Sequence, residues 1–187
     1  AAMSPSETTY FDTSVAAHAK HRIAWLLILM FSSTITGSII TKYKNAFAAI
    51  PLLVSFIPML MDTGGNCGSQ SSTLIIRGIA LGEIRFSDLF RVMFKEFRVS
   101  LIVGVVLALA NGLRILIMYR NAGLALVIGL SLVATVIISK LIGCLLPLFA
   151  KKLHMDPAIM ASPLITTLVD TCSILIYFNI ATRIFQL

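Results

Sequence analysis

The sequence predicts an all-helical integral membrane protein with five transmembrane helices, a short N-terminal cytoplasmic helix and an interfacial amphipathic helix between the second and third spans. Composition is one reason, because 58% of the 187 residues are hydrophobic and 12% are charged, unlike an ordinary soluble domain. Segment length is the other, because several apolar runs approach or exceed the roughly 18 to 20 residues that a helix needs to cross hydrocarbon. These runs cover residues 23–40, 46–61, 101–118, 124–149 and 158–180.

The N-terminal part is more polar than the rest of the chain. Residues 13–22, TSVAAHAKHR, have the composition of a short helix that leads into the first span. Trp25 and Tyr43 lie near the two ends of that span, where amphipathic rings prefer to sit. We therefore divide the chain into a tail with a connecting helix, residues 1–22, and a five-helix transmembrane domain, residues 23–187.

The second span is followed by a run of glycine and polar residues, PMLMDTGGNCGSQ, at residues 58–70. Glycines permit unusual backbone dihedrals, so the run predicts a break in the helix. Such a segment at membrane depth must face protein or water. Three residues, four apart, supply oxygens: Asp62, Asn66 and Gln70; Gly64 and Gly65 lie between them. The alternative is a simple loop that joins two short helices.

Apolar side chains, several of them aromatic, recur at helical spacing over residues 86–97, and the basic residues nearby fall mainly on other positions of the helix. This pattern predicts an amphipathic helix in the membrane interface. It would brace the membrane surface or, as an alternative, act as a gating element.

The last apolar run contains Asp170 near its middle, where an ionised side chain costs roughly 2.5 to 3.5 kcal/mol. Asp170 shares one helix face with four other polar residues: Ser162, Thr166, Ser173 and Tyr177. Carboxylate and hydroxyl oxygens are suitable ligands for a hard cation, so the face predicts a path for such an ion. The alternative is that Asp170 pairs with Lys140 or another buried base and only holds helices together.

The net charge of +7 does not indicate a nucleic-acid partner, because the basic residues lie at the helix ends. Their distribution predicts a multi-pass protein of the cell (inner) membrane with a cytoplasmic N-terminus and an extracytoplasmic C-terminus. Three cysteines without metal-site spacing, Cys67, Cys144 and Cys172, are expected to be buried thiols.

Movement of a hard cation across the membrane is the function that these features favour, and a passive channel for a divalent cation is our hypothesis. A cation-coupled exchanger is an alternative, with the broken helix as a coordinating element. A structural subunit would leave Asp170 as a packing residue. An enzyme is not expected: an intramembrane hydrolase would need a serine such as Ser69, Ser71 or Ser162 beside a base, but the histidines lie at helix margins and G-x-S-x-G does not occur.

Two runs together, PMLMDTGGNCGSQSSTLIIRGIALGEI and DPAIMASPLITTLVDTCSILIYF, resemble the transmembrane domain of the MgtE family of magnesium channels. The resemblance implies a homodimer in the lipid bilayer with the pore between subunits, and Mg²⁺ as the transported ion, with Mn²⁺ or other divalent ions as further candidates. It implies that Asp170 contacts the partly hydrated ion and that the Thr166 carbonyl helps to hold its water shell. Ser162 matches a pore-lining position, and we add as pore-lining candidates Ser173, Asn66, Asp62, Gln70, Gly64 and Gly65.

Members of this family also carry a cytoplasmic acidic domain and paired nucleotide-binding-type modules that sense magnesium. Residues 13–22 resemble the end of the helix that follows those modules. The transmembrane part alone would then contain the ion path, and the magnesium sensor would be a separate element.

Overall fold

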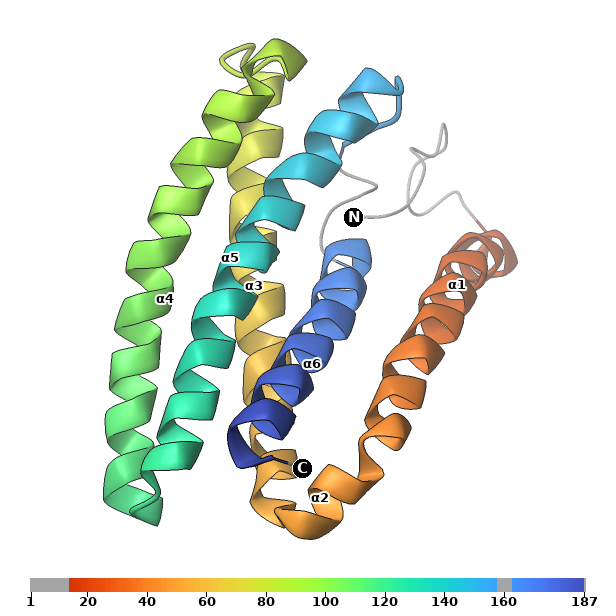
Figure 1. Cartoon of the computed structure of the whole chain (residues 1–187). Coiled ribbons are helices and arrows are strands. Elements are labelled where there is room, and N and C mark those ends of the chain that lie inside the picture. Colours follow the sequence, from red (N-terminus) through yellow and green to blue (C-terminus); the bar gives the residue numbers. More distant parts are fainter. Residues whose placement is uncertain (1–13, 158–162, 187) are drawn as a thin grey trace.

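The computed structural model describes residues 14–157 and 163–186, and the regular structure in these residues is helical throughout. Long helices run side by side in alternating directions (Figure 1). They are α1 (Val15–Lys42), α3 (Ile57–Ala80), α4 (Leu89–Tyr119), α5 (Ala122–Lys152) and α6 (Pro163–Phe185). The short elements are α2 (Lys44–Ala49) and two 3-10 helices, η1 (Pro51–Phe56) and η2 (Phe86–Asp88).

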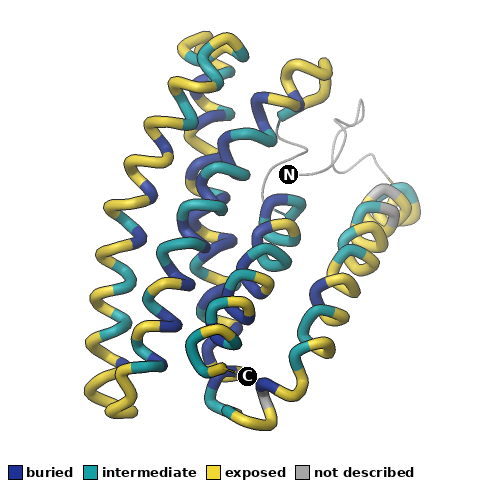
Figure 2. The backbone as a smooth tube through the Cα atoms, viewed as in Figure 1, coloured by how far each residue is buried: buried dark blue, intermediate teal, exposed yellow. Residues whose placement is uncertain are grey.

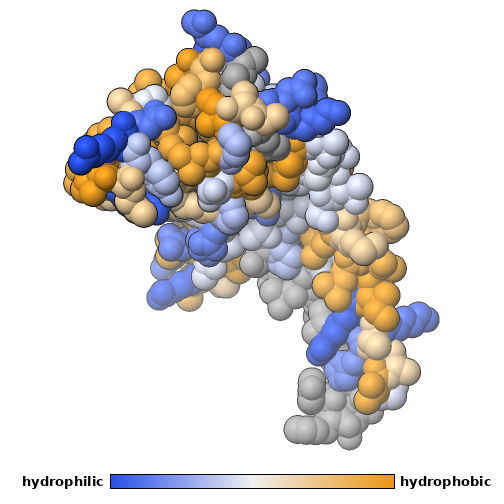
Figure 3. Space-filling view, turned by 90° about the horizontal axis from the view of Figure 1, so that it is seen from below, coloured by the Kyte–Doolittle hydropathy of each residue, from blue (hydrophilic) through white to orange (hydrophobic). Residues whose placement is uncertain are grey.

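Four helices of the described chain are long and apolar enough to cross a membrane. They are α1, α4 with the preceding η2, α5 and α6. Hydrophobic side chains also dominate much of the surface seen from below, with hydrophilic ones in separate clusters (Figure 3). The α3 helix has 24 residues but polar residues in its middle. The predicted count of five spans therefore requires that α3 also crosses the membrane.

The predicted second span at residues 46–61 is wrong. That stretch contains α2, η1 and only the first turn of α3. Prolines explain the difference: Pro51 stands in the first turn of η1, and Pro58 stands in the first turn of α3, where a missing N–H is tolerated. The long helix thus begins at Ile57 and continues through the polar run.

The predicted break at residues 58–70 is also wrong, because α3 is one unbroken helix. The glycines allow close helix packing rather than unusual dihedrals. A Cβ atom added at Gly143 of α5 would overlap the backbone carbonyl of Gly68 of α3, so these two helices touch through their backbones.

We expect Gly143→Ala to destabilise the folded protein by about 1 to 3 kcal/mol, because the new methyl group meets backbone atoms that cannot rotate away. Thermal unfolding in detergent measures the effect. The matched control is Gly112→Ala in α4, where an added Cβ has no neighbour within 4 Å and alanine is the better helix former. Equal unfolding temperatures for the two variants would contradict the close α3–α5 contact.

Two predicted helix boundaries, one near residue 22 and one between residues 97 and 101, are absent from the described residues. The proposed connecting helix is the beginning of α1, and the proposed interfacial helix is the beginning of α4, not a separate element. The reason is local, since no proline or glycine separates residues 86–97 from residues 101–118. With 31 residues, α4 is about 46 Å long, more than the roughly 30 Å of hydrocarbon.

The buried residues of the bundle lie mainly on α3, α5 and α6, whereas α1 and α4 are mostly exposed (Figure 2). The α6 helix contacts α1, α3 and α5, and α4 packs along α5. Near the α2 end, the Tyr177 hydroxyl donates a hydrogen bond of 2.8 Å to the Leu53 carbonyl. This contact fixes the rotation of α6 and thereby the direction of its polar residues.

Candidate functional site

The crossing of α3 and α6 brings the two polar segments of the sequence together. A Cβ atom added at Gly64 would lie 2.7 Å from Val169, and one added at Gly65 would lie 3.0 Å from Thr166. Because the helices are antiparallel, the residues before Gly64 lie beside those after Val169. Asp62 of α3 is thereby placed next to Asp170 of α6.

The Asp62 and Asp170 carboxylates are close enough to repel each other. Asp62 is exposed and Asp170 is half-buried. Neither has a basic partner in the described chain, where the ion pair found joins Lys140 to Glu96. Two neighbouring carboxylates without a basic partner in the described residues form a position at which a cation would be stabilised.

The described residues contain no group of three or more His, Cys, Asp or Glu side chains that could hold a metal ion. A dry calcium site would need more carboxylates than this pair. Magnesium keeps several of its waters and is held by one or two carboxylates, so the pair fits a partly hydrated magnesium ion.

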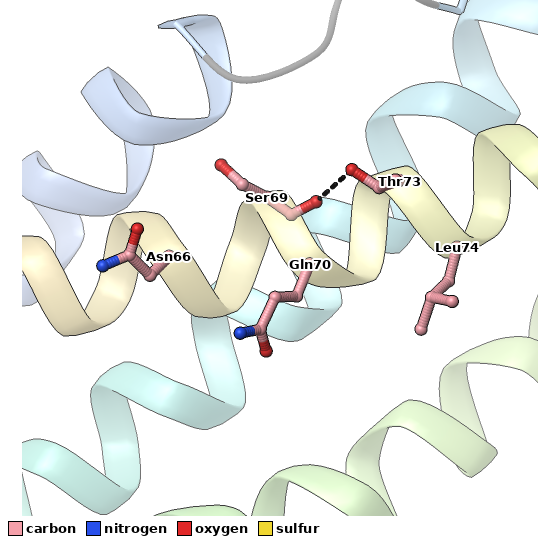
Figure 4. A pocket seen from close by; sticks show the side chains of 5 residues that line it. All are labelled: Asn66, Ser69, Gln70, Thr73 and Leu74. Carbon is pink, nitrogen blue, oxygen red and sulfur yellow. Dashed lines mark hydrogen bonds between the residues drawn. The ribbon is translucent and has the colours of Figure 1, made fainter.

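A groove lies along the exposed face of α3, where Asn66 and Gln70 follow Asp62 at intervals of four residues. Its volume is about 630 Å³, and five side chains line it: Asn66, Ser69, Gln70, Thr73 and Leu74. The Asn66 and Gln70 amides project away from the helix axis, and the Thr73 hydroxyl donates to the Ser69 carbonyl at 2.9 Å (Figure 4). The groove therefore extends the polar surface by about two helical turns beyond the carboxylates.

The serine and threonine hydroxyls described in α6 donate hydrogen bonds to its own backbone. Thr166 and Thr167 both donate to the Pro163 carbonyl, at 2.9 and 2.8 Å. The Thr166 oxygen keeps its lone pairs and can accept from an ion's water shell. On the other side of Asp170, Thr171 and Thr36 of α1 share a hydrogen bond of 2.9 Å, which holds α1 against α6.

Other predicted pore-lining residues are buried within the single chain. Ser173 is 1% exposed, faces Gly64 and donates to the Val169 carbonyl at 2.7 Å. Gly64 and Gly65 are buried against α6 as well. In this chain these three residues pack α3 against α6, whereas Asp62, Asn66 and Gln70 are exposed. Ser162 lies outside the described residues.

The alternative pairing of Asp170 with Lys140 is wrong. The Lys140 ammonium lies 3.9 Å from Glu96 Oε2 and donates to Ser71 Oγ at 3.3 Å, and Ser71 donates to the same Glu96 oxygen at 2.6 Å. Lys140, Glu96 and Ser71 are 5%, 9% and 0% exposed. This buried cluster joins α5, α4 and α3, and Asp170 has no counter-ion among the described residues.

Sequence reasoning missed Glu96, although a signal was present. Glu96, Ser100 and Gly104 follow one another at intervals of four on one face of α4, and all three are buried. An acid on the same helix face as small residues, within a mainly basic and aromatic segment, indicates a side chain that faces the bundle rather than the interface.

Long apolar helices, a pair of uncompensated carboxylates at a helix crossing and a polar groove beside them define a class. The class is that of multi-pass membrane proteins with a hydrophilic helix face at membrane depth, as found in membrane transport proteins.

Comparison with known proteins gives the family within that class. The family model MgtE, described as a divalent cation transporter, matches residues 57–180, so the chain belongs to the MgtE family. Magnesium transporter MgtE of Bacillus subtilis is 40% identical over 172 residues, 92% of this chain and 38% of that protein. The transporter of the same name from Thermus thermophilus is 34% identical over 182 residues, 96% of this chain and 40% of that protein. The chain thus spans about two fifths of these relatives, whose names describe transporters, not enzymes.

Proposed function

We propose that this chain is the membrane-spanning part of a magnesium transporter, and that it forms a passive Mg²⁺ channel at the interface of a homodimer. The observation that carries the proposal is the position of Asp170 beside Asp62, without a basic partner in the described residues. The family membership and the names of the relatives supply the ion.

Each residue of the site has a role in this proposal. Asp170 attracts the ion, the Thr166 carbonyl and hydroxyl contact its water shell, and Asp62 adds charge at the same level. Asn66 and Gln70 offer amide oxygens along the groove. A second copy of the chain would double the negative charge at the symmetry axis.

No external energy source is needed for inward movement. A membrane potential of about 100 mV, negative inside, favours entry of a divalent ion by about 4.6 kcal/mol. Because most of the contacts to the ion would pass through water, the full cost of removing its hydration shell is avoided. Ions with similar hydration, such as Mn²⁺, would use the same path.

We propose that α3 also crosses the membrane, which gives five transmembrane helices, and that the N-terminus is cytoplasmic. One end of the bundle carries nine basic residues: Lys20, Arg22, Arg77, Arg85, Arg91, Lys95, Arg98, Lys151 and Lys152. The other end carries five: Lys42, Lys44, Arg114, Arg120 and Arg183. Lysine and arginine are enriched on the cytoplasmic side, so the first group would face the cytoplasm of the cell membrane. In this arrangement residues 1–22 are the tail and connecting segment, and residues 23–187 are the pore domain.

The exchanger alternative depended on a discontinuous second helix. Because α3 is continuous from Ile57 to Ala80, that feature no longer supports it. A channel remains the function that the geometry favours.

We expect liposomes with this chain to take up Mg²⁺ under an inside-negative potassium diffusion potential, with equal sodium concentration and pH on both sides. Uptake should scale with the electrochemical gradient of Mg²⁺ and be absent from protein-free liposomes. Uptake that requires an opposing sodium or proton gradient would replace the channel by an exchanger. No uptake under either condition would contradict a transport function of the chain by itself.

A further inference from the structure

A ladder of basic side chains follows the outward face of the first turns of α4. Arg91, Lys95 and Arg98 are spaced by four and three residues, which places them on one helix face, and all three are exposed. None of them forms a salt bridge within the described chain, where the ion pair found is that of Lys140 and Glu96. Three cations therefore lie side by side without an anionic partner among the described residues.

The ladder borders a hollow of about 420 Å³ that also has an apolar part. Phe94, Val99 and Ile102 complete its lining, and Phe94 and Ile102 are 64% and 69% exposed. The Arg98 guanidinium lies 5.9 Å from the centre of the Phe94 ring, which orients its charge toward the hollow. Positive charge at one end and hydrocarbon at the other complement the shape of a phospholipid.

The packing of the opposite face of α4 keeps the ladder on the outside of the bundle. Glu96, Ser100 and Gly104 lie on the opposite face and are buried, and Glu96 is bonded to Ser71 of α3 at 2.6 Å. Rotating the helix to hide the ladder would break that buried contact. The ladder is therefore presented to the surroundings of the bundle.

The position of the ladder along α4 matches the depth of the lipid headgroup layer. Residues 99–119 of α4 span about 31 Å at 1.5 Å per residue, close to the roughly 30 Å of hydrocarbon. Arg98 then lies at the boundary of the hydrocarbon, and Arg91 lies about 10 Å further out. The headgroup region on each side is roughly 5 to 7 Å thick, so Lys95 and Arg98 fall within it.

Two acids lie near the outer end of the ladder. Glu83 and Asp88 line an adjacent hollow together with Arg91 and Lys95, and Asp88 accepts a hydrogen bond from the Arg85 backbone at 2.9 Å. They weaken the positive field mainly at Arg91. The strongest attraction for an anion is thus at Lys95 and Arg98, next to the apolar part of the hollow.

We propose that this face of α4 binds an anionic phospholipid, with the phosphate between Lys95 and Arg98 and an acyl chain along Val99 and Ile102. The site is separate from the ion path, because it lies on the outer side of α4 and the path lies on α3 and α6. The proposal does not depend on the transport function.

The test is native mass spectrometry of the purified chain in detergent with added phosphatidylglycerol or phosphatidylcholine. The parent chain should retain phosphatidylglycerol in preference to phosphatidylcholine, and the R91Q/K95Q/R98Q variant should lose about tenfold or more of that preference. The matched control, K42Q/K44Q/R120Q, removes three cations from the opposite end of the bundle and should keep the preference.

A second measurement needs no substitution, so it stands if the triple variant does not fold. A phosphatidylglycerol with a photoreactive acyl chain should crosslink the parent chain at residues 94–102. Unchanged preference in the R91Q/K95Q/R98Q variant, equal loss in both variants, or crosslinks spread evenly over the lipid-facing helices would each overturn the proposal.

Discussion

Liposomes with the Asp170→Asn chain are expected to take up Mg²⁺ at least about tenfold more slowly than liposomes with the parent chain. The substitution keeps the shape of the side chain and removes its charge. At an effective dielectric constant of about 20, two unit charges 4 Å apart interact by about 4 kcal/mol, and loss of about one third of that energy corresponds to a factor of ten. Asp62 alone cannot compensate, because it is exposed and therefore better screened.

The control for Asp170→Asn is Glu83→Gln, which removes an exposed carboxylate from the link between α3 and α4. Its uptake rate should equal that of the parent chain. Asp170→Glu should retain part of the uptake, since the charge is kept and only its position changes. A parent-like rate for a correctly folded Asp170→Asn chain would remove Asp170 from the ion path.

Glu96→Ala is expected to destabilise the folded protein by about 3 to 5 kcal/mol, because it leaves the Lys140 ammonium buried without its counter-ion. Ser71 would lose its acceptor at the same time. The contact between α3, α4 and α5 depends on these three groups, so the unfolding temperature in detergent should fall strongly.

The matched control replaces both charged residues, as Glu96→Met with Lys140→Met. Apolar side chains of similar length leave no buried charge, so the double variant should be much more stable than Glu96→Ala. A double variant as unstable as the single one would show that the cluster stabilises through its charges, contrary to the expectation. A Glu96→Ala chain that unfolds like the parent would contradict the burial of the pair.

The all-helical membrane class was predictable, and Asp170 stood out as a candidate, because both rest on properties of single segments. Long apolar runs indicate membrane helices whatever they pack against, and an acid in the middle of such a run is costly in any arrangement. The course of α3 was not predictable in the same way. Its glycines are compatible with a broken helix and with a tightly packed one, and only the contact of Gly68 with Gly143 selects the second.

The partners of the charged residues could not be read from the sequence either. Asp62 lies beside Asp170 because α3 and α6 cross at Gly64 and Gly65, a register set by the packing of two distant segments. Lys140 pairs with Glu96 rather than Asp170 for the same kind of reason, since α4 covers α5 at that level. Spacing along one helix identifies a polar face, but the opposing face depends on tertiary packing.

The most direct test of an ion path along the polar face of α3 and α6 is the reactivity of a cysteine placed at Asn66, in a chain whose native cysteines are replaced by alanine. A charged, water-soluble thiol reagent should label the Asn66→Cys chain in liposomes, and Mg²⁺ should slow the labelling. Leu109→Cys is the control, because Leu109 is 69% exposed on the outer side of α4, where lipid would cover it. Protection by Mg²⁺ at position 66 with no labelling at position 109 is the result we expect. An unreactive position 66, or labelling that Mg²⁺ does not change, would contradict a water-filled ion path along α3.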